Sequence, residues 1–375
     1  MKTLYNIKIV IGVCGSIAAV ETVKLVHELR RRGADVTAIL SEAACGIINP
    51  EALTYACQKP ALTKITGLVE HVKYCGEGGE ADLLLIAPST ANTISKIACG
   101  IDDTIITTFA TTALGRKMPV VLVPAMHESM YHHPILKKNI ETLKEIGIDI
   151  VPPKMEEEKA KMADIETVCL YCERAVNSKK LLGKKVVVSS GSCREELDDV
   201  RILTTRSSGK MGREMALEAF RLGAHVCAVS NTKIHGKIPC VENIDITSAD
   251  DMRKAVLENI AGADYYVSAA AISDFKPKRE AGKIPSGAEV KITLEPLEKL
   301  ISRVNVKTIG FKLGENSVEE GKKLLEKKNI VLVAANKPET MGSVNAEYVL
   351  LTENGEKKIS GTKEEAAKEI WNVLL

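Results

Sequence analysis

Glycine, serine, threonine and arginine residues are concentrated in one stretch near the middle of the chain, between Ser189 and Gly212. Glycine lets the backbone approach a ligand closely, hydroxyls and a helix N-terminus donate hydrogen bonds to anions, and arginine binds phosphate or carboxylate in a bidentate manner. The stretch is not a Walker A loop, because Thr204 stands where that motif requires a glycine. These residue types predict a site for a small phosphorylated or carboxylated ligand.

A second glycine turn, Gly12-Val13-Cys14-Gly15-Ser16, follows the first apolar run of the chain. A strand over 6–13, an amphipathic helix and a strand over 35–40 are predicted around it. A dinucleotide-binding fingerprint requires Gly-x-Gly-x-x-Gly and an acidic residue after the second strand, which here ends in Leu40-Ser41. The pattern disfavours an NAD oxidoreductase. It leaves open a mononucleotide phosphate held with the help of Ser16, or a tight turn without a ligand.

Two more polar loops follow apolar strands, predicted over 81–87 and 120–123. They read Pro88-Ser89-Thr90-Ala91-Asn92 and Pro124-Ala125-Met126-His127. Polar residues at the carboxyl ends of parallel strands mark the ligand-binding edge of an open α/β sheet. His71 lies at a predicted helix start, where a histidine by itself is more often structural than catalytic.

Composition narrows the class of protein. A chain of 375 residues favours two domains, and 45% hydrophobic with 27% charged residues is typical of a globular protein. Only 3% aromatic residues and a net charge of +2 give no reason to expect a nucleic-acid or membrane partner. Ten cysteines without a recognisable secretory signal indicate a reducing, cytoplasmic environment.

The pattern of strand, glycine turn and helix restarts after a charge-rich joint over 154–184. We therefore predict an α/β protein with two Rossmann-like three-layer domains, 1–180 and 181–375. The second domain is expected to end with a small β-ribbon, formed by strands over 348–351 and 358–360, and a helix over 363–373.

The first half resembles the flavin-containing cysteine decarboxylases, and among them the phosphopantothenoylcysteine decarboxylases of coenzyme A synthesis. The resemblance spans residues 5–155 and rests on four motifs in the order of that family: Gly12 to Ala19, His71, Ala87 to Asn92, and Pro124-Ala125-Met126 with Met130. It implies a flavodoxin-like domain that binds FMN at a trimer interface, with His71 at the catalytic position. The FMN contacts that it implies are Gly15, Ser16, Ser41, Pro88, Ser89, Thr90 and Asn92.

The chemistry of that family explains these residue types. FMN oxidises the cysteinyl thiol of the substrate to a thioaldehyde, carbon dioxide leaves, and the resulting enethiol is reduced. A base near the thiol and carboxylate is needed, and an imidazole near neutral pH suits this task.

Two positions depart from the family pattern. His127 replaces an asparagine expected to bind the substrate carboxylate. The region corresponding to the mobile flap, 152–162, lacks the cysteine that protonates the enethiolate. Two interpretations are open for Lys154, Lys159 and Lys161. One of them replaces the missing cysteine as the proton donor, or all three belong to a run of charged residues exposed to solvent. The flavin prenyltransferases share this fold and are the nearest alternative for this half.

The second half resembles the phosphopantothenate–cysteine ligases along its whole length. Five motifs carry the resemblance: 191–201, Ser207-Ser208-Gly209-Lys210-Met211-Gly212, 269–274, Gly310-Phe311-Lys312, and Lys323-Leu324-x-x-Lys327. It implies that CTP, with Mg²⁺, activates the carboxylate of phosphopantothenate as an acyl-cytidylate. The amine of cysteine then displaces CMP.

The resemblance also assigns ligase residues. The nucleotide contacts are Ser268, Ala269, Ala270, Asp274, Lys283, Glu298, Lys299, Leu300, Ile301, Phe311, Lys323 and Lys327. The substrate contacts are Arg194, Arg201, Arg206, Ser207, Ser208, Gly209 and Lys210. Lys283 is expected to neutralise charge on the transferring phosphate, and the spacing of Lys323 and Lys327 predicts that they share one helix face.

Two ligase positions differ from that family. Thr205 stands where an asparagine assists turnover of the acyl-cytidylate, and it offers one hydroxyl in place of an amide. Lys283-Ile284-Pro285-Ser286 replaces Lys-x-Lys-Lys, which leaves the choice between CTP and another triphosphate open, and the Mg²⁺ ligands are not identified. We expect a homo-oligomer built from trimeric decarboxylase and dimeric ligase contacts, for which a dodecamer is one solution.

We therefore predict a bifunctional enzyme that ligates cysteine to phosphopantothenate and then decarboxylates the product. The alternative is an active ligase whose flavin domain is a different flavin enzyme or a non-catalytic flavin- or nucleotide-binding module.

Overall fold

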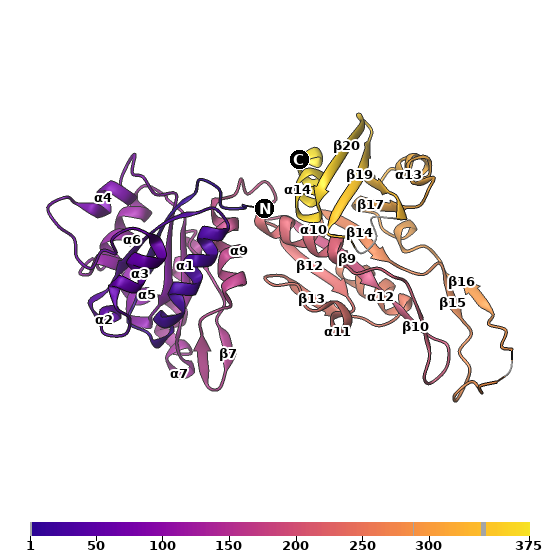
Figure 1. Ribbon diagram of the computed structural model, residues 1–375, viewed down its shortest axis with the longest axis horizontal. Helices are drawn as coiled ribbons and strands as arrows, with labels where there is room; N and C mark the ends of the chain where they lie inside the picture. Colours follow the sequence, from indigo (N-terminus) through magenta and orange to yellow (C-terminus); the bar gives the residue numbers. More distant parts are fainter. Residues whose placement is uncertain (1, 288, 339–342) are drawn as a thin grey trace. The chain divides into compact units, whose positions relative to one another are not determined.

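The computed structural model describes residues 2–287, 289–338 and 343–375. The chain divides into two compact units, Met1–Ser178 and Lys179–Leu375, drawn in Figure 1 from indigo to magenta and from magenta to yellow.

Unit 1 is built on a parallel sheet in the order β2-β1-β3-β4-β6, the strand order of flavodoxin-like folds. Its strands are β1 (Lys8–Val13), β2 (Asp35–Leu40), β3 (Leu83–Ser89), β4 (Val120–Pro124) and β6 (Asp149–Ile150). Its helices are η1 (Ile17–Glu21), α1 (Thr22–Arg31), α2 (Glu42–Cys45), α3 (Pro50–Cys57), α4 (Glu70–Cys75), α5 (Ala91–Ala98), α6 (Ile105–Gly115), α7 (Glu128–Tyr131), α8 (Pro134–Glu145) and α9 (Ile165–Val176).

Helices cover both faces of this sheet. Ile9, Ile11 and Val13 of β1 pack with α1, α3 and α9, whereas Val10 packs on the opposite face with α5, α6 and α8. Because both faces are buried, the strands are almost continuously apolar rather than alternating. This is the three-layer arrangement that the sequence predicts.

The charge-rich segment 154–161 takes part in a small antiparallel sheet. Strand β5 (Met126–His127) pairs with β8 (Lys159–Lys161), which pairs with β7 (Lys154–Glu156). The register sets Met126 opposite Ala160 and His127 opposite Lys159. The predicted flap is thereby hydrogen-bonded to the loop that carries His127.

Unit 2 is built on an eight-stranded sheet in the order β13-β12-β9-β14-β17-β18-β19-β20. Counted along the chain, its six parallel strands run 3-2-1-4-5-6, the Rossmann order. These strands are β9 (Lys185–Ser192), β12 (His225–Ser230), β13 (Glu242–Asp245), β14 (Tyr265–Ala271), β17 (Lys307–Leu313) and β18 (Ile330–Asn336). The helices are α10 (Lys210–Arg221), α11 (Thr232–His235), α12 (Ala249–Asn259), η2 (Leu300–Ser302), α13 (Ser317–Leu325) and α14 (Lys363–Leu374).

The predicted β-ribbon is present, but it extends the main sheet. Strands β19 (Asn345–Thr352) and β20 (Gly355–Thr362) pair with each other, and β19 also pairs antiparallel with β18. The turn contains two residues, Glu353 and Asn354, because Thr352 lies opposite Gly355. Helix α14 then packs against α10, where the indole of Trp371 donates a hydrogen bond to the Met215 carbonyl at 3.2 Å.

Two further pairs of short antiparallel strands lie outside the main sheet of unit 2. Strands β10 (Arg194–Glu196) and β11 (Ile202–Thr204) pair within the central glycine-rich stretch. Strands β15 (Phe275–Pro277) and β16 (Leu294–Pro296) form an arm that extends away from the main sheet of unit 2 (Figure 1).

None of the helices in the described ranges is long and apolar enough to cross a membrane.

A buried ion pair fastens the last helix of unit 1 to the first. Arg32 Nη1 lies 2.8 Å from Glu173 Oε1, and these side chains are 19% and 2% exposed. We expect Glu173→Ala to lower the free energy of unfolding by about 3 kcal/mol, because it leaves Arg32 half-buried without this partner. Urea unfolding followed by circular dichroism measures the change.

The matched control for this substitution is Glu141→Ala, which removes an exposed pair with Lys144 at 2.8 Å. An exposed pair contributes at most about 1 kcal/mol. Equal losses in the two variants would contradict a special contribution from the buried pair.

Candidate functional sites

Four predicted flavin-binding turns of unit 1 are joined by backbone hydrogen bonds at the carboxyl edge of the sheet. The amide of Ser41 donates to Val13 at 3.0 Å, Cys14 donates to Pro88 at 3.2 Å, and Ala125 donates to Ser89 at 3.1 Å. The turns after β1, β2, β3 and β4 therefore form one edge. This edge includes the point between β1 and β3 where the strand order reverses, the usual ligand position in such sheets.

Gly15 allows helix α2 to approach the first turn. A Cβ atom at Gly15 would lie 2.5 Å from the Cβ of Ala43, closer than two carbon atoms can approach. Helix α2 is capped by the Ser41 hydroxyl, which accepts from the Ala44 amide at 3.2 Å. The structure thus gives Ser41 a capping role, and its predicted contact with FMN stays a prediction.

The loop after β3 combines satisfied and unsatisfied polar groups. The Thr90 hydroxyl caps α5 by accepting from the Thr93 amide at 3.3 Å, and Asn92 is exposed in the first turn of that helix. Ser89 is fully buried, and its Oγ has no hydrogen-bond partner. Since a buried hydroxyl without a partner costs free energy, Ser89 is a natural position for a ligand's polar group.

His71 is the second unsatisfied group of unit 1. Its Nδ1 is buried without a hydrogen-bond partner, and its ring packs edge-on against Phe109 with centroids 6.4 Å apart. The preceding Val69 has φ of 47°, a left-handed conformation that is strained for a β-branched residue. A buried ring nitrogen without a partner, two residues after a strained backbone position, is typical of a functional position.

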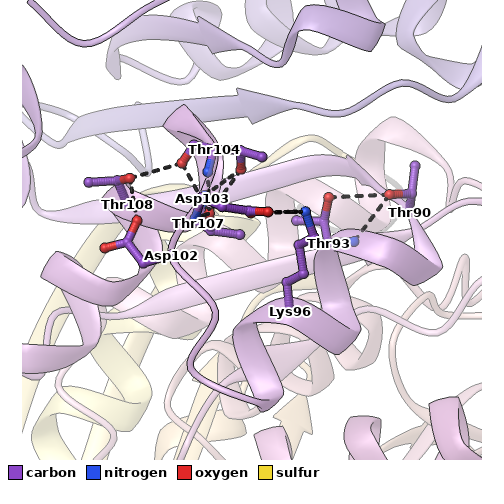
Figure 2. Close-up of polar contacts among 8 residues, drawn as sticks. All are labelled: Thr90, Thr93, Lys96, Asp102, Asp103, Thr104, Thr107 and Thr108. Atoms are coloured by element: carbon purple, nitrogen blue, oxygen red, sulfur yellow. Dashed lines mark hydrogen bonds and ion pairs between the residues drawn. The ribbon is translucent and has the colours of Figure 1, made fainter.

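A polar network holds α6, which carries Phe109, against α5 (Figure 2). Lys96 of α5 contacts the Asp103 carboxylate at 2.7 and 2.9 Å, and the Asp103 amide donates to Thr107 at 3.2 Å. Thr104 and Thr107 form a reciprocal cap at the start of α6. The network thereby links α5, which Thr90 caps, to the helix that packs against His71.

His127 caps the short helix α7. Its Nδ1 accepts from the Ser129 amide at 3.4 Å and lies 2.9 Å from the Ser129 hydroxyl. With Nδ1 acting as an acceptor, the proton of the neutral ring resides on Nε2. His127 can therefore still donate one hydrogen bond, as the asparagine of the resembling family would.

Strand pairing in unit 2 brings three distant ligase motifs together. Gly191 of β9 lies opposite Ala270 of β14, and Ser268 lies opposite Gly310 of β17. The reversal of strand order falls between β9 and β14, so these motifs surround the expected ligand crevice.

Gly310, in the middle of β17, brings two further predicted segments against this strand. A Cβ atom at Gly310 would lie 3.2 Å from Leu324 of α13 and 3.8 Å from Ile301 of η2. The glycine therefore permits close packing of the segments that contain Lys323 and 298–301. Phe311 packs edge-on against Tyr348 with centroids 5.9 Å apart.

Asp198 ties the loop of Lys283 to the central stretch. Its buried carboxylate accepts hydrogen bonds from the amides of Val200, Arg201 and Ile284 at 2.6–3.0 Å. Burial acts to raise its pKa, but these bonds and the Arg201 guanidinium together hold the pKa of Asp198 far below its ordinary value.

Arg201 takes part in the same anchor. Its Nη1 lies 2.5 Å from Asp198 and donates to the Ile284 carbonyl at 3.1 Å. Arg201 thus has a structural role, and its predicted contact with substrate stays a prediction. Lys283, next to this anchor, is exposed.

Thr205 is engaged with the neighbouring motif. Its hydroxyl donates to the Ala271 carbonyl at 3.1 Å, and the Thr204 hydroxyl donates to Cys193 at 2.8 Å. These bonds connect the segment before Ser207-Ser208-Gly209 to the ends of β14 and β9.

The charged residues predicted for the ligase site are mostly exposed: Arg194, Arg206, Lys210, Asp274, Lys283, Lys299, Lys323 and Lys327. One expectation about them is wrong. Helix α13 ends at Leu325, so Lys327 lies beyond it and does not share a helix face with Lys323. The Glu298 side chain is occupied by Arg303 at 2.8 and 2.9 Å, which leaves its backbone as the group that can contact a nucleotide.

Sequence reasoning missed three residues at this edge: Asp198 as an anchor, His235 and Ser230. Ser230 at the end of β12 is buried, and its Oγ has no partner. The place of Ser230 at the end of a strand was a signal, whereas nothing in the local sequence distinguished His235.

Cys169 and Cys172 are both buried thiols in α9. Within the described part of the chain, no group of three or more histidine, cysteine or acidic residues could hold a metal ion.

Comparison with known proteins now defines the class. The family model "Flavoprotein" matches residues 1–177, and the model "DNA/pantothenate metabolism flavoprotein C-terminal domain" matches residues 181–375. Both units thus correspond to flavoprotein-related families, with the unit 2 family named for pantothenate metabolism.

Relatives similar along the whole chain identify the family. The coenzyme A biosynthesis bifunctional protein CoaBC of Thermococcus kodakarensis is 43% identical and covers 100% of this chain and 96% of that protein. The proteins of the same name from Methanocaldococcus jannaschii and Bacillus subtilis are 36% and 32% identical, covering 98% and 91% of this chain and 93% and 88% of theirs. The chain belongs to the CoaBC family of coenzyme A biosynthesis bifunctional proteins. The family and the α/β fold class predicted from the sequence are confirmed.

Gly15 provides a test of the first site. We expect Gly15→Ala to weaken FMN binding by about 5- to 150-fold, because overpacking against Ala43 moves α2 and the turn apart at a cost of about 1–3 kcal/mol. Flavin absorbance per chain and titration with FMN measure the effect.

Gly115→Ala is the matched control, because no heavy atom lies within 4 Å of the added Cβ. Full FMN occupancy in Gly15→Ala would show that the close approach of α2 is not needed for binding.

Proposed function

We propose that the chain catalyses two consecutive steps of coenzyme A biosynthesis. Residues 181–375 ligate cysteine to 4′-phosphopantothenate with CTP through an acyl-cytidylate. Residues 1–180 then decarboxylate phosphopantothenoylcysteine to 4′-phosphopantetheine with FMN. The observation that carries this proposal is the similarity of the whole chain to bifunctional CoaBC proteins, supported by glycine and hydroxyl turns at the carboxyl ends of β1 and β3 in unit 1 and of β9 and β14 in unit 2.

The edge of unit 1 fits FMN. The close approach at Gly15 forms a backbone cradle, and Ser89 Oγ and His71 Nδ1 are buried polar atoms without partners. Gly15, Ser16, Ser89 and Thr90 would hold the cofactor. When bound, FMN supplies the two-electron oxidation and reduction that make loss of carbon dioxide possible.

His71 and His127 act on the substrate in this proposal. His71 would accept or hold the proton at its unpaired Nδ1, next to the thiol and carboxylate of the substrate. His127 would donate from Nε2 to the carboxylate, because its Nδ1 is used by Ser129.

In unit 2, different motifs would bind the substrate and the nucleotide. Arg194, Arg206 and the segment 207–210 would hold phosphopantothenate, and the ends of β14 and β17 would hold the nucleotide. Lys283, placed by the Asp198 anchor, would neutralise charge on the transferring phosphate. Mg²⁺ would enter with the triphosphate, since it usually retains waters and binds through substrate phosphates.

We further propose a cytoplasmic homo-oligomer in which the flavin site meets another subunit. Large apolar residues are exposed beside two of the four flavin motifs: Ile17 and Val20 follow Ser16, and Leu68 and Val72 flank His71. Ile17 and Leu68 are 77% and 78% exposed, which supports coverage by a partner.

Product analysis tests the proposed function directly. We expect phosphopantothenate, cysteine, CTP and Mg²⁺ to yield 4′-phosphopantetheine, carbon dioxide, CMP and pyrophosphate with the FMN-loaded protein. Mass spectrometry identifies the products, and ATP in place of CTP tests the choice of nucleotide. Accumulation of phosphopantothenoylcysteine without loss of carbon dioxide would contradict the decarboxylase assignment.

The His71→Asn variant separates the two activities. We expect decarboxylation to fall by about 10²–10⁴-fold, because the variant removes the acid–base group. Ligation, measured as pyrophosphate release, should stay within about twofold of the original rate. A comparable loss of both activities would argue against independent sites.

A further inference from the structure

His235 lies between the two glycine turns of the central stretch. Its Nε2 is 3.1 Å from the Ser192 amide and 3.3 Å from the Ser192 hydroxyl. A Cβ atom at Gly191 would lie 2.3 Å from ring atom Cδ2, and one at Gly209 would lie 3.3 Å from Cγ. The ring therefore packs directly against the backbone of both glycines. A side chain at either position would collide with it or crowd it.

The two turns also touch each other at this point. A Cβ atom at Gly209 would lie 3.3 Å from the Gly191 Cα, and the Ser190 hydroxyl donates to the Gly209 carbonyl at 3.0 Å. Both glycines have left-handed φ values, +81° and +69°, which glycine adopts without the strain that a side chain would cause. Gly209 is the N-cap residue of α10, the helix that follows the predicted substrate-binding motif.

Helix α11, which ends in His235, is fixed at its beginning. Asp245 of β13 accepts from the Thr232 amide at 2.8 Å and from its hydroxyl at 2.6 Å, and the Asn231 side chain accepts from the Ile234 amide at 3.2 Å. The imidazole is thus presented from a rigid element rather than from a free loop.

The contacts define the protonation state of the ring. Because the Ser192 amide can only donate, the facing Nε2 must be unprotonated and the proton must reside on Nδ1. Burial lowers the pKa of His235, a hydrogen bond with the Ser208 backbone opposes this shift, and the charge of Arg194 lowers the pKa further.

The elements around the ring carry further charged groups. Lys210 and Arg213 lie in the first turn of α10, Lys233 lies on α11, and Glu242 and Asp245 lie on β13. Arg213 donates to the Lys237 carbonyl, and Asp245 accepts from Thr232.

We propose that His235 is a positioning residue of the ligase site, whose neutral imidazole clamps the turn after β9 to the turn before α10. This inference rests on the proposed ligase function. The clamp keeps the Ser207-Ser208-Gly209-Lys210 segment in the arrangement that receives phosphopantothenate. Protonation of Nε2 would place two donors, the ring N–H and the Ser192 amide, against each other and open the clamp.

Three forms of the protein test the clamp: the original chain, His235→Gln and His235→Leu. Glutamine can accept from Ser192 and donate elsewhere without titrating, whereas leucine fills space without an acceptor. The ligase reaction is followed by pyrophosphate release between pH 5.5 and 8, and KM for phosphopantothenate is separated from kcat. The fluorescence of Trp371, the single tryptophan of the chain, reports whether unit 2 is folded.

We expect His235→Leu to raise KM at least about tenfold at pH 8, and His235→Gln to stay within about threefold. In the original chain KM should rise as pH falls below about 6.5, because the folded pKa lies below the ordinary value of histidine. The substrate phosphate also titrates near pH 6, and this contributes to the pH dependence of KM. His235→Gln measures that contribution alone, because glutamine does not titrate, and its KM should rise less at low pH.

Each outcome decides between the inferences. Absence of ligation in the original chain would overturn the proposed function itself. Unchanged KM in a folded His235→Leu variant would overturn the clamp alone. If KM rises at low pH as much in His235→Gln as in the original chain, the imidazole of His235 does not control the pH dependence. If His235→Leu fails to fold, the pH profile of His235→Gln decides the question.

Discussion

Parallel hydrogen bonding between neighbouring strands is the constraint on which both sites depend. Because parallel strands end at the same edge of a sheet, the register of β9 and β14 sets Gly191 beside Ala270, although 79 positions separate them in the chain. The same geometry aligns the turns after β1, β2, β3 and β4 in unit 1. In each unit the polar turns meet where the strand order reverses, and the buried apolar strands behind them keep this edge rigid.

Close backbone packing then shapes each edge. Gly15, Gly191 and Gly310 all stand where a Cβ atom would collide with or crowd a neighbouring element. Ordering a glycine backbone costs more conformational entropy than ordering other residues, and the packing of the surrounding sheet and helices offsets this cost. Ser89 Oγ, His71 Nδ1 and Ser230 Oγ are buried atoms without hydrogen-bond partners within the described chain, so the two units retain polar groups available to ligands.

The anchors behind these edges could not be predicted from local sequence. Asp198 looked like one more acidic residue of a polar motif, yet it holds the loop of Lys283 by accepting the Ile284 amide. His235 follows a strand that carried no recognised motif, and only the fold brings it to Ser192. Lys323 and Lys327 had helical spacing, but the helix stops at Leu325, so spacing alone did not place Lys327 on it.

Local sequence determined the elements and their order. Apolar runs, glycine turns and helix patterns along the chain were enough to predict two three-layer α/β units, and motif types indicated anion-binding turns at strand ends. Only the tertiary structure decided which side chains are occupied and which are free to act. Hydrogen bonds across 66 positions, as from Thr205 to Ala271, or across 83, as from Arg201 to Ile284, depend on strand register and close packing that no local pattern encodes.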